Sequence, residues 1–179
     1  KAVSPSSWTL PAFASLLTGV SPAVHLVDAS GRLPAAIATL PEILRRYGYT
    51  TGAIVENPLF APPSEFAGRF DDTAPLAAVW YGASPMLPMS VGPRTGQALF
   101  AAGRRQSGAS AVTDLALAWL RRAEWGRAFL WVHYMGPHAP YTPAAVAAAH
   151  ARVAAGPGAD AARTAYFGEV VEADTAVGS

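Results

Sequence analysis

The first apolar pattern in the chain lies at residues 11–18, with the sequence PAFASLLT. It opens with a proline, which suits the first turn of a helix, and it is followed by Gly19, which suits the residue after a helix ends. A short apolar helix is therefore predicted here, and Thr9 is predicted to lie just ahead of it.

A second helix is predicted within residues 33–48. Thr39 and Glu42 have the spacing of a capping box, positions 43, 44 and 47 form an apolar stripe, and Gly48 ends the pattern. The run TTGAIV at residues 50–55 is typical of a short buried strand, and it ends at Glu56-Asn57-Pro58.

The second half of the chain repeats the order of helix and strand. Apolar positions with helical spacing predict a helix over residues 110–124, and the run FLWVHY at residues 129–134 predicts a strand covered on both faces. Further helices are predicted at residues 95–105, 144–155 and 161–177, the last with Tyr166, Val170, Ala173 and Val177 on one face. Residues 59–93 are rich in proline and glycine and are predicted to form long surface connections.

Buried strands that alternate with amphipathic helices predict an α/β architecture with a mainly parallel sheet flanked by helices. Only two strands are evident in the pattern, and two strands do not form a stable sheet alone. The chain also starts without Met and stops within its last pattern. We therefore expect residues 1–179 to be a single partial domain that is incomplete at both ends.

Composition excludes several classes of function. A chain that is 51% hydrophobic is not intrinsically disordered, and 13 basic against 12 acidic residues provide no positive surface for nucleic acid. No run reaches the roughly 18 apolar residues of a membrane helix. The absence of cysteine excludes disulfides, thiolate metal sites and a cysteine nucleophile. Oligomeric state is left open by the sequence.

Candidate chemistry gathers where the predicted strands end, because ligands of parallel α/β sheets bind at the carboxyl ends of the strands. This reasoning selects Thr9, Asn57, His133 and His138. His138 lies in a rigid turn between two prolines, where it could bind an anionic substrate, protonate a leaving group or merely satisfy local carbonyl groups. His133 lies within the strand, so a core role is the alternative for it.

Thr9 deserves separate treatment because a hydroxyl at a helix N-terminus meets unpaired N–H groups and the positive end of the helix dipole. Such a place binds anions and favours an alkoxide. The alternative is that Ser6, Ser7 or Thr9 simply caps the helix. A second candidate, the pair Asp71-Asp72, has the composition of a metal site but also that of a turn.

Four segments, in order and over nearly the whole chain, resemble the sulfatase-like hydrolases of the alkaline phosphatase superfamily. The first is SSWTLPAFASLLTG followed by SPAVH, which resembles the segment that carries the nucleophile. The others are TLPEILRRYGYTTGAIVENPLF, FLWVHYMGPHAPYTP and YFGEVVEADTAVG. The resemblance implies an alkaline-phosphatase-like fold and chemistry on phosphate or sulfate esters.

By that resemblance the nucleophile is Thr9. Sulfatases proper have a cysteine there, converted to formylglycine within C-x-P-S-R, and here threonine replaces the cysteine and Phe13 the arginine. Threonine is the nucleophile in the phosphodiesterase and phosphoethanolamine-transferase branches. The Lys-x-His pair of sulfatases falls on Glu56 and Pro58, so Asn57 between them is expected to contact substrate instead.

The same resemblance assigns the anion-contacting histidine to His138 and places Gly136 where many relatives have Asp. We assign His133 to substrate binding with Asn57. The family's metal ligands imply a divalent cation (Zn, Ca, Mg or Mn) of which Thr9 is the contact in this chain, the others lying before Lys1 and after Ser179. We therefore expect this chain alone to bind the metal poorly and to be inactive.

The implied substrate is a small-molecule, lipid or glycan ester, and the implied location is periplasmic, secreted or membrane-anchored. A rival hypothesis is a catalytically inactive binding or scaffold domain of the same family. Phe13 in place of Arg and Gly136 in place of Asp favour the rival.

Overall fold

The computed structural model describes residues 3–28, 31–60, 65–75, 108–122, 126–138, 141, 158 and 160–178. Among them, each strand is preceded or followed by helical segments, as the sequence pattern requires. The elements are α1 (Thr9–Thr18), α2 (Pro22–His25), α3 (Leu40–Arg46), β1 (Thr50–Val55), the 3-10 turns η1 (Pro58–Phe60) and η2 (Ala67–Arg69), β2 (Asp72–Pro75), α6 (Gly108–Arg121), β3 (Ala128–His133) and α8 (Ala161–Val177). None of the described helices is both long and apolar enough to span a membrane.

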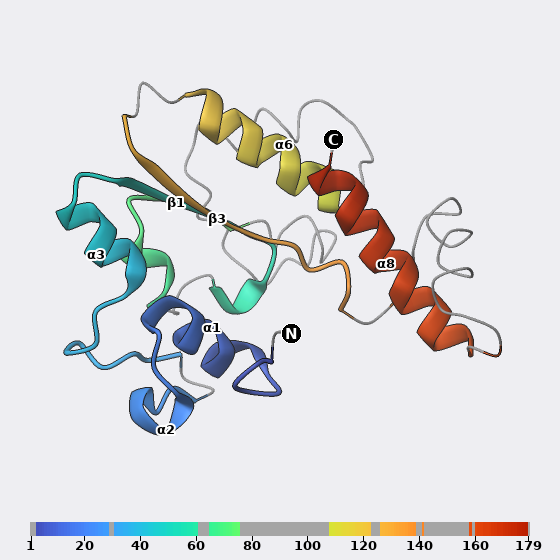
Figure 1. Cartoon of the computed structure of the whole chain (residues 1–179), viewed down its shortest axis with the longest axis horizontal. Helices are drawn as coiled ribbons and strands as arrows, with labels where there is room; N and C mark the ends of the chain where they lie inside the picture. The colour runs from blue at the N-terminus through green and yellow to red at the C-terminus, as the bar shows by residue number, and fades with distance from the viewer. Residues whose placement is uncertain are drawn as a thin grey trace, which may run out of the picture.

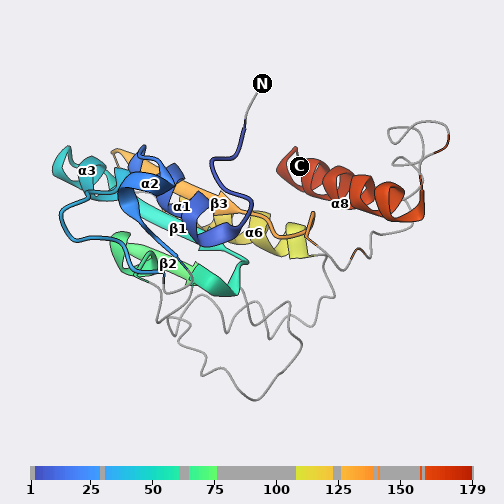
Figure 2. The same ribbon diagram turned by 90° about the horizontal axis from the view of Figure 1, so that it is seen from below.

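The described strands form one parallel sheet in the order β2-β1-β3, and Figure 2 shows them side by side. Val55 of β1 pairs with His133 of β3 and with Pro75 of β2, so the carboxyl ends of all three strands meet at one edge. The predicted α/β class with a parallel sheet is confirmed.

The strand β2 was not predicted, because its segment was assigned to surface connections. Four residues, DTAP, carry no apolar alternation and end in a proline, so nothing in the local pattern indicates a strand. Pairing with β1 makes this segment a strand at the edge of the described sheet. Asp72 pairs with Gly52, a residue about 20 positions earlier in the sequence, and this distant pairing makes the segment a strand.

Helices cover both faces of the sheet, with α1, α2 and α3 on one side and α6 on the other (Figure 1). The alternation along β1 divides the core, since Ala53 and Val55 face α1 whereas Ile54 faces α6. The first cluster is completed by Leu10, Phe13, Ala14, Leu17, Val27, Leu33, Phe60, Phe66 and Phe70, and the second by Val112, Leu115, Ala116 and Trp119.

Several element boundaries differ from prediction. Helix α1 begins at Thr9 rather than after it, α3 occupies only the last part of residues 33–48, and the short α2 was not predicted. The capping box is confirmed, since Glu42 Oε2 accepts a hydrogen bond from Thr39 N at 2.8 Å. The predicted helices at residues 95–105 and 144–155 lie outside the described residues.

Helix α8 has the predicted bounds but not the predicted buried face. Tyr166 and Val177 are exposed, whereas Gly168, Glu169 and Ala176 are buried. The reason is the partner: α8 packs beside α6, where Thr113 Oγ1 donates to Ala176 O at 2.9 Å, and not across the sheet. An apolar stripe therefore did not identify the contact face of this helix.

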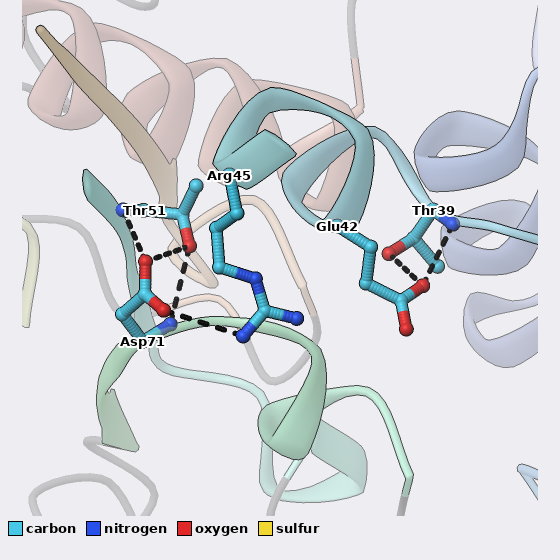
Figure 3. A network of polar contacts seen from close by, with 5 residues as sticks. All are labelled: Thr39, Glu42, Arg45, Thr51 and Asp71. Atoms are coloured by element: carbon cyan, nitrogen blue, oxygen red, sulfur yellow. Dashed lines mark hydrogen bonds and ion pairs between the residues drawn. The ribbon is translucent and has the colours of Figure 1, made fainter. Parts of the chain in front are cut away.

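A polar network ties α3 to the amino ends of β1 and β2 (Figure 3). Asp71 Oδ2 accepts hydrogen bonds from Thr51 N at 2.9 Å and Thr51 Oγ1 at 2.8 Å, and Asp71 Oδ1 lies 3.2 Å from Arg45 Nη1. Burial raises the pKa of Asp71, but these hydrogen bonds and the Arg45 charge outweigh it and hold the pKa below its ordinary value. The network stabilises the fold at the end of the sheet opposite the predicted site.

The neighbouring Asp72 points to the other face, where its Oδ2 accepts from Trp119 Nε1 at 3.1 Å and lies 3.4 Å from Arg122 Nη2. Adjacent residues of a strand project to opposite faces of a sheet. Asp71 and Asp72 therefore fasten α3 and α6 separately and do not form a joint metal site.

Candidate functional site

The carboxyl edge of the sheet brings together two segments that lie about 80 residues apart in the sequence. Glu56 and Asn57 follow β1, and residues 134–138 follow β3. Glu56 N donates to His133 O at 3.3 Å, which extends the pairing of the two strands by one residue. This edge is where the sequence analysis placed the site.

Thr9 is the first residue of α1 and is partly buried. The residue before it, Trp8, makes no side-chain capping bond, and the first helical hydrogen bond runs from Ala12 N to Trp8 O at 3.4 Å. Ser6 Oγ accepts from Trp8 N at 3.4 Å, so the local turn uses the serine hydroxyl. Within the described part of the chain the Thr9 hydroxyl makes no hydrogen bond, so it does not cap the helix.

Phe13, one helical turn after Thr9, fixes α1 on the sheet. Its ring meets the rings of Trp131 and His133 edge-on, at centroid distances of 4.9 and 5.1 Å. These contacts place α1 beside the carboxyl half of β3. Phe13, which the resemblance aligns with the family arginine, is 6% exposed and belongs to the hydrophobic core.

His133 lies on the same face of β3 as Trp131, and its Nδ1 is buried with no hydrogen-bond partner among the described residues. Burial lowers the pKa of His133 below its ordinary value, because the protonated ring loses hydration. Burial therefore favours the neutral form of the imidazole. A neutral ring can accept a hydrogen bond as well as donate one.

Asn57 is buried, and both ends of its side chain contact the protein. Its Oδ1 accepts from Leu59 N at 2.9 Å, and its Nδ2 lies 3.5 Å from Met135 Sδ. Its backbone oxygen accepts from Phe60 N at 3.1 Å, which starts the 3-10 turn η1. Asn57 thus shapes the loop after β1 at the edge where substrate binding was predicted.

His138 is exposed and ends a tight turn after β3. Its backbone N donates to Met135 O at 2.9 Å and to Gly136 O at 2.7 Å. The turn is in contact with α8, since a Cβ atom on Gly136 would lie 3.5 Å from Glu169 Oε2. His138 is thus carried by a segment that neighbouring elements hold in place.

Glu56 also belongs to this site, although the pattern of the sequence did not select it. Its side chain is 1% exposed, and its Oε2 accepts from Met135 N at 2.7 Å. A carboxylate directly after a run of buried strand residues was the available signal, because a buried charge needs a specific partner.

The structure thus gathers Glu56, Asn57 and His133 around the start of the turn that carries His138, and it sets the helix of Thr9 against His133. The described residues contain no group of three or more His, Asp or Glu side chains that could hold a metal ion. By themselves they do not fit a divalent cation, which requires several oxygen or nitrogen ligands in fixed geometry.

The chain belongs to the Sulfatase family, whose model matches residues 1–179. Among solved structures it is similar to Ps i-CgsB in complex with k-i-k-neocarrahexaose, with 17% identity and a TM-score of 0.65 over 97% of this chain and 44% of that one. It is also similar to Ps i-CgsB alone, with 18% identity and a TM-score of 0.58 over 94% of this chain and 42% of that one. No curated protein matches the chain.

At such identities the structural likeness confirms the fold, while the family model establishes membership. The chain spans less than half the length of the solved structures that it matches. A sulfatase-like α/β domain is the class that fold and family define together.

Proposed function

We propose that residues 1–179 are part of a single catalytic domain that cleaves or transfers sulfate or phosphate esters with Thr9 as its nucleophile. The observation that carries the proposal is the position of the Thr9 hydroxyl, which starts α1 and is not consumed by capping. The fold supports it, because the helix that carries Thr9 packs on the carboxyl half of β3.

In the proposed reaction Thr9 Oγ1 attacks the phosphorus or sulfur atom in line. The hydroxyl proton of Thr9 passes to solvent as the bond from Oγ1 to that atom forms, and the bond to the ester oxygen breaks to leave an alcohol once that oxygen takes up a proton. Water or an acceptor alcohol later takes the group from Thr9, whose oxygen regains a proton. The N-terminus of α1 stabilises negative charge on the nonbridging oxygens. His138 binds one of these oxygens or gives a proton to the leaving alcohol.

Asn57 and His133 complete the proposal as substrate-contacting residues. The neutral imidazole of His133 suits an uncharged hydroxyl of the alcohol portion better than an anionic oxygen, because it carries no charge to pair. One N–H of Asn57 Nδ2 is directed at the Met135 sulfur, so the other N–H of this group is the one that would contact the substrate.

Sulfatases generally use a divalent metal, which lowers the pKa of an attacking hydroxyl and neutralises charge on the ester. We propose Thr9 as the contact of this chain to such an ion. The remaining ligands must come from residues other than the described ones, since these contain no suitable group. No step of the reaction is therefore assigned to the metal.

Among ester classes, we propose a sulfated glycan. The support is the solved structure of Ps i-CgsB, which holds the oligosaccharide k-i-k-neocarrahexaose and resembles this chain in fold. Threonine at position 9 and the absence of the Lys-x-His pair instead favour a phosphate ester, so both classes belong in the test. A substrate of this kind goes with a secreted, periplasmic or membrane-anchored enzyme.

The test is turnover of 4-nitrophenyl sulfate, bis(4-nitrophenyl) phosphate and a sulfated oligosaccharide by the protein that contains this chain, with Zn, Ca, Mg or Mn supplied. Thr9→Ala is expected to lose turnover by a factor on the order of a thousand or more, because the nucleophile is removed. Thr18→Ala is the matched control, since it removes a hydroxyl from the other end of the same helix. Unchanged turnover in Thr9→Ala would refute the proposal.

The second candidate is a binding domain without catalysis. The observation that favours it is Phe13, buried where sulfatases have an arginine. In that case the protein binds the sulfated oligosaccharide, turns over none of the esters with any of the metals, and binds equally well after Thr9→Ala.

A further inference from the structure

A buried carboxylate stands where β1 ends. Glu56 is 1% exposed, although carboxylates are rarely buried without a specific partner. Its Oε2 accepts a hydrogen bond from Met135 N at 2.7 Å. This distance lies at the short end of the range for an N–H···O hydrogen bond. The partner is a backbone amide, so the bond holds the chain path after β3.

Only a short backbone path separates this bond from His138. The amide of Met135 is bound by Glu56, and its carbonyl oxygen accepts from His138 N at 2.9 Å. The Met135 sulfur also lies 3.5 Å from Asn57 Nδ2. Glu56 and Asn57, the two residues that directly follow β1, therefore both contact Met135. The carbonyl oxygen of Met135 in turn closes the turn that carries His138.

We propose that Glu56 is a positioning residue for His138. It fixes residues 135–138 against the end of β1 and thereby sets the direction in which the exposed imidazole projects. The side chain is too deeply buried to contact an anionic ester itself. The inference deepens the proposed function, since it rests on the role of His138 there.

The structural arm of the test measures amide hydrogen exchange of Met135 and His138 by NMR. Glu56→Leu removes the acceptor, and we expect both amides to exchange about tenfold faster or more, since the hydrogen bond that holds Met135 is lost. Glu56→Gln keeps an acceptor oxygen, and exchange about two- to threefold faster is expected. If the leucine variant does not fold, the glutamine variant still decides: exchange identical to wild type overturns the proposal.

The matched control is Thr51→Val. Thr51 is a fully buried residue of β1, the strand that Glu56 follows, and its side-chain hydrogen bond to Asp71 lies at the opposite end of the sheet. This variant should lower overall stability without a selective change at Met135 and His138. Equal acceleration in Thr51→Val and Glu56→Leu would show that only global stability changed, and it would overturn the proposal.

The catalytic arm is a double-mutant cycle on ester turnover. Glu56→Leu is expected to reduce kcat/KM about tenfold or more in the wild-type background and to add nothing in a His138→Ala background. Full additivity of the two losses would overturn a positioning role. If His138→Ala alone leaves turnover intact, the proposed catalytic role of His138 fails, and the exchange arm still decides whether Glu56 holds the turn.

Discussion

Replacing Phe13 by alanine probes the aromatic cluster that sets the helix of Thr9 on the sheet. Phe13 is 6% exposed and meets Trp131, His133 and two further phenylalanine rings edge-on. Truncation of a buried phenylalanine costs about 3–5 kcal/mol, because burial is lost and a cavity remains. At about 2–4 °C for each kcal/mol in a domain of this size, the melting midpoint should fall by roughly 6–20 °C.

Thermal and urea unfolding of the protein measure this loss, with Leu16→Ala as the control. Leu16 lies on the same helix but is 63% exposed, so its truncation should cost less than about 0.5 kcal/mol. An NMR titration should also show the pKa of His133 moving up toward its ordinary value, because the missing ring uncovers the imidazole. Equal midpoints for the two variants would refute the assignment of Phe13 to the core.

Three further predictions follow from single side chains. Burial lowers the pKa of His133, so the unfolded chain binds the proton of this histidine more readily than the folded chain does. The contribution of the neutral ring to stability is therefore complete above about pH 6.5 and is lost as the pH falls through the folded-state pKa. Urea unfolding between about pH 7 and 5 measures this loss. Gly52→Ala should destabilise by about 1–3 kcal/mol, because a Cβ atom would lie 2.5 Å from the ring of Trp119. Gly136→Asp should destabilise more at about pH 8 than at about pH 4, because its carboxylate would stand beside Glu169.

Each of the three has a matched control. His133→Phe should remove its part of the pH dependence, and an unchanged slope would contradict the assignment. Gly126→Ala, at a site with no atom within 4 Å of the added Cβ, should leave the unfolding midpoint nearly unchanged, and a loss equal to that of Gly52→Ala would rule out the clash. Gly136→Asn adds similar bulk without charge, so an equal loss would exclude repulsion.

The sequence alone was sufficient for the elements whose local chemistry is self-contained. The capping box of Thr39 and Glu42 located a helix start, and the apolar runs at 50–55 and 129–134 became the two paired strands β1 and β3. Their parallel order then followed from the intervening helix. It also placed candidate residues at one edge of the sheet, because parallel strands share their carboxyl ends.

The features that the sequence did not predict depend on contacts between segments that are distant along the chain. The segment DTAP is a strand only because β1 offers it hydrogen bonds, and α8 buries Ala176 because it packs on α6. Likewise, Glu56 belongs to the site because the fold brings its carboxyl group to the amide of Met135, 79 residues later in the sequence. Periodicity and motifs report how a segment meets its immediate neighbours and solvent. Contacts between segments are decided by the free energy of the assembled core, which no local pattern contains.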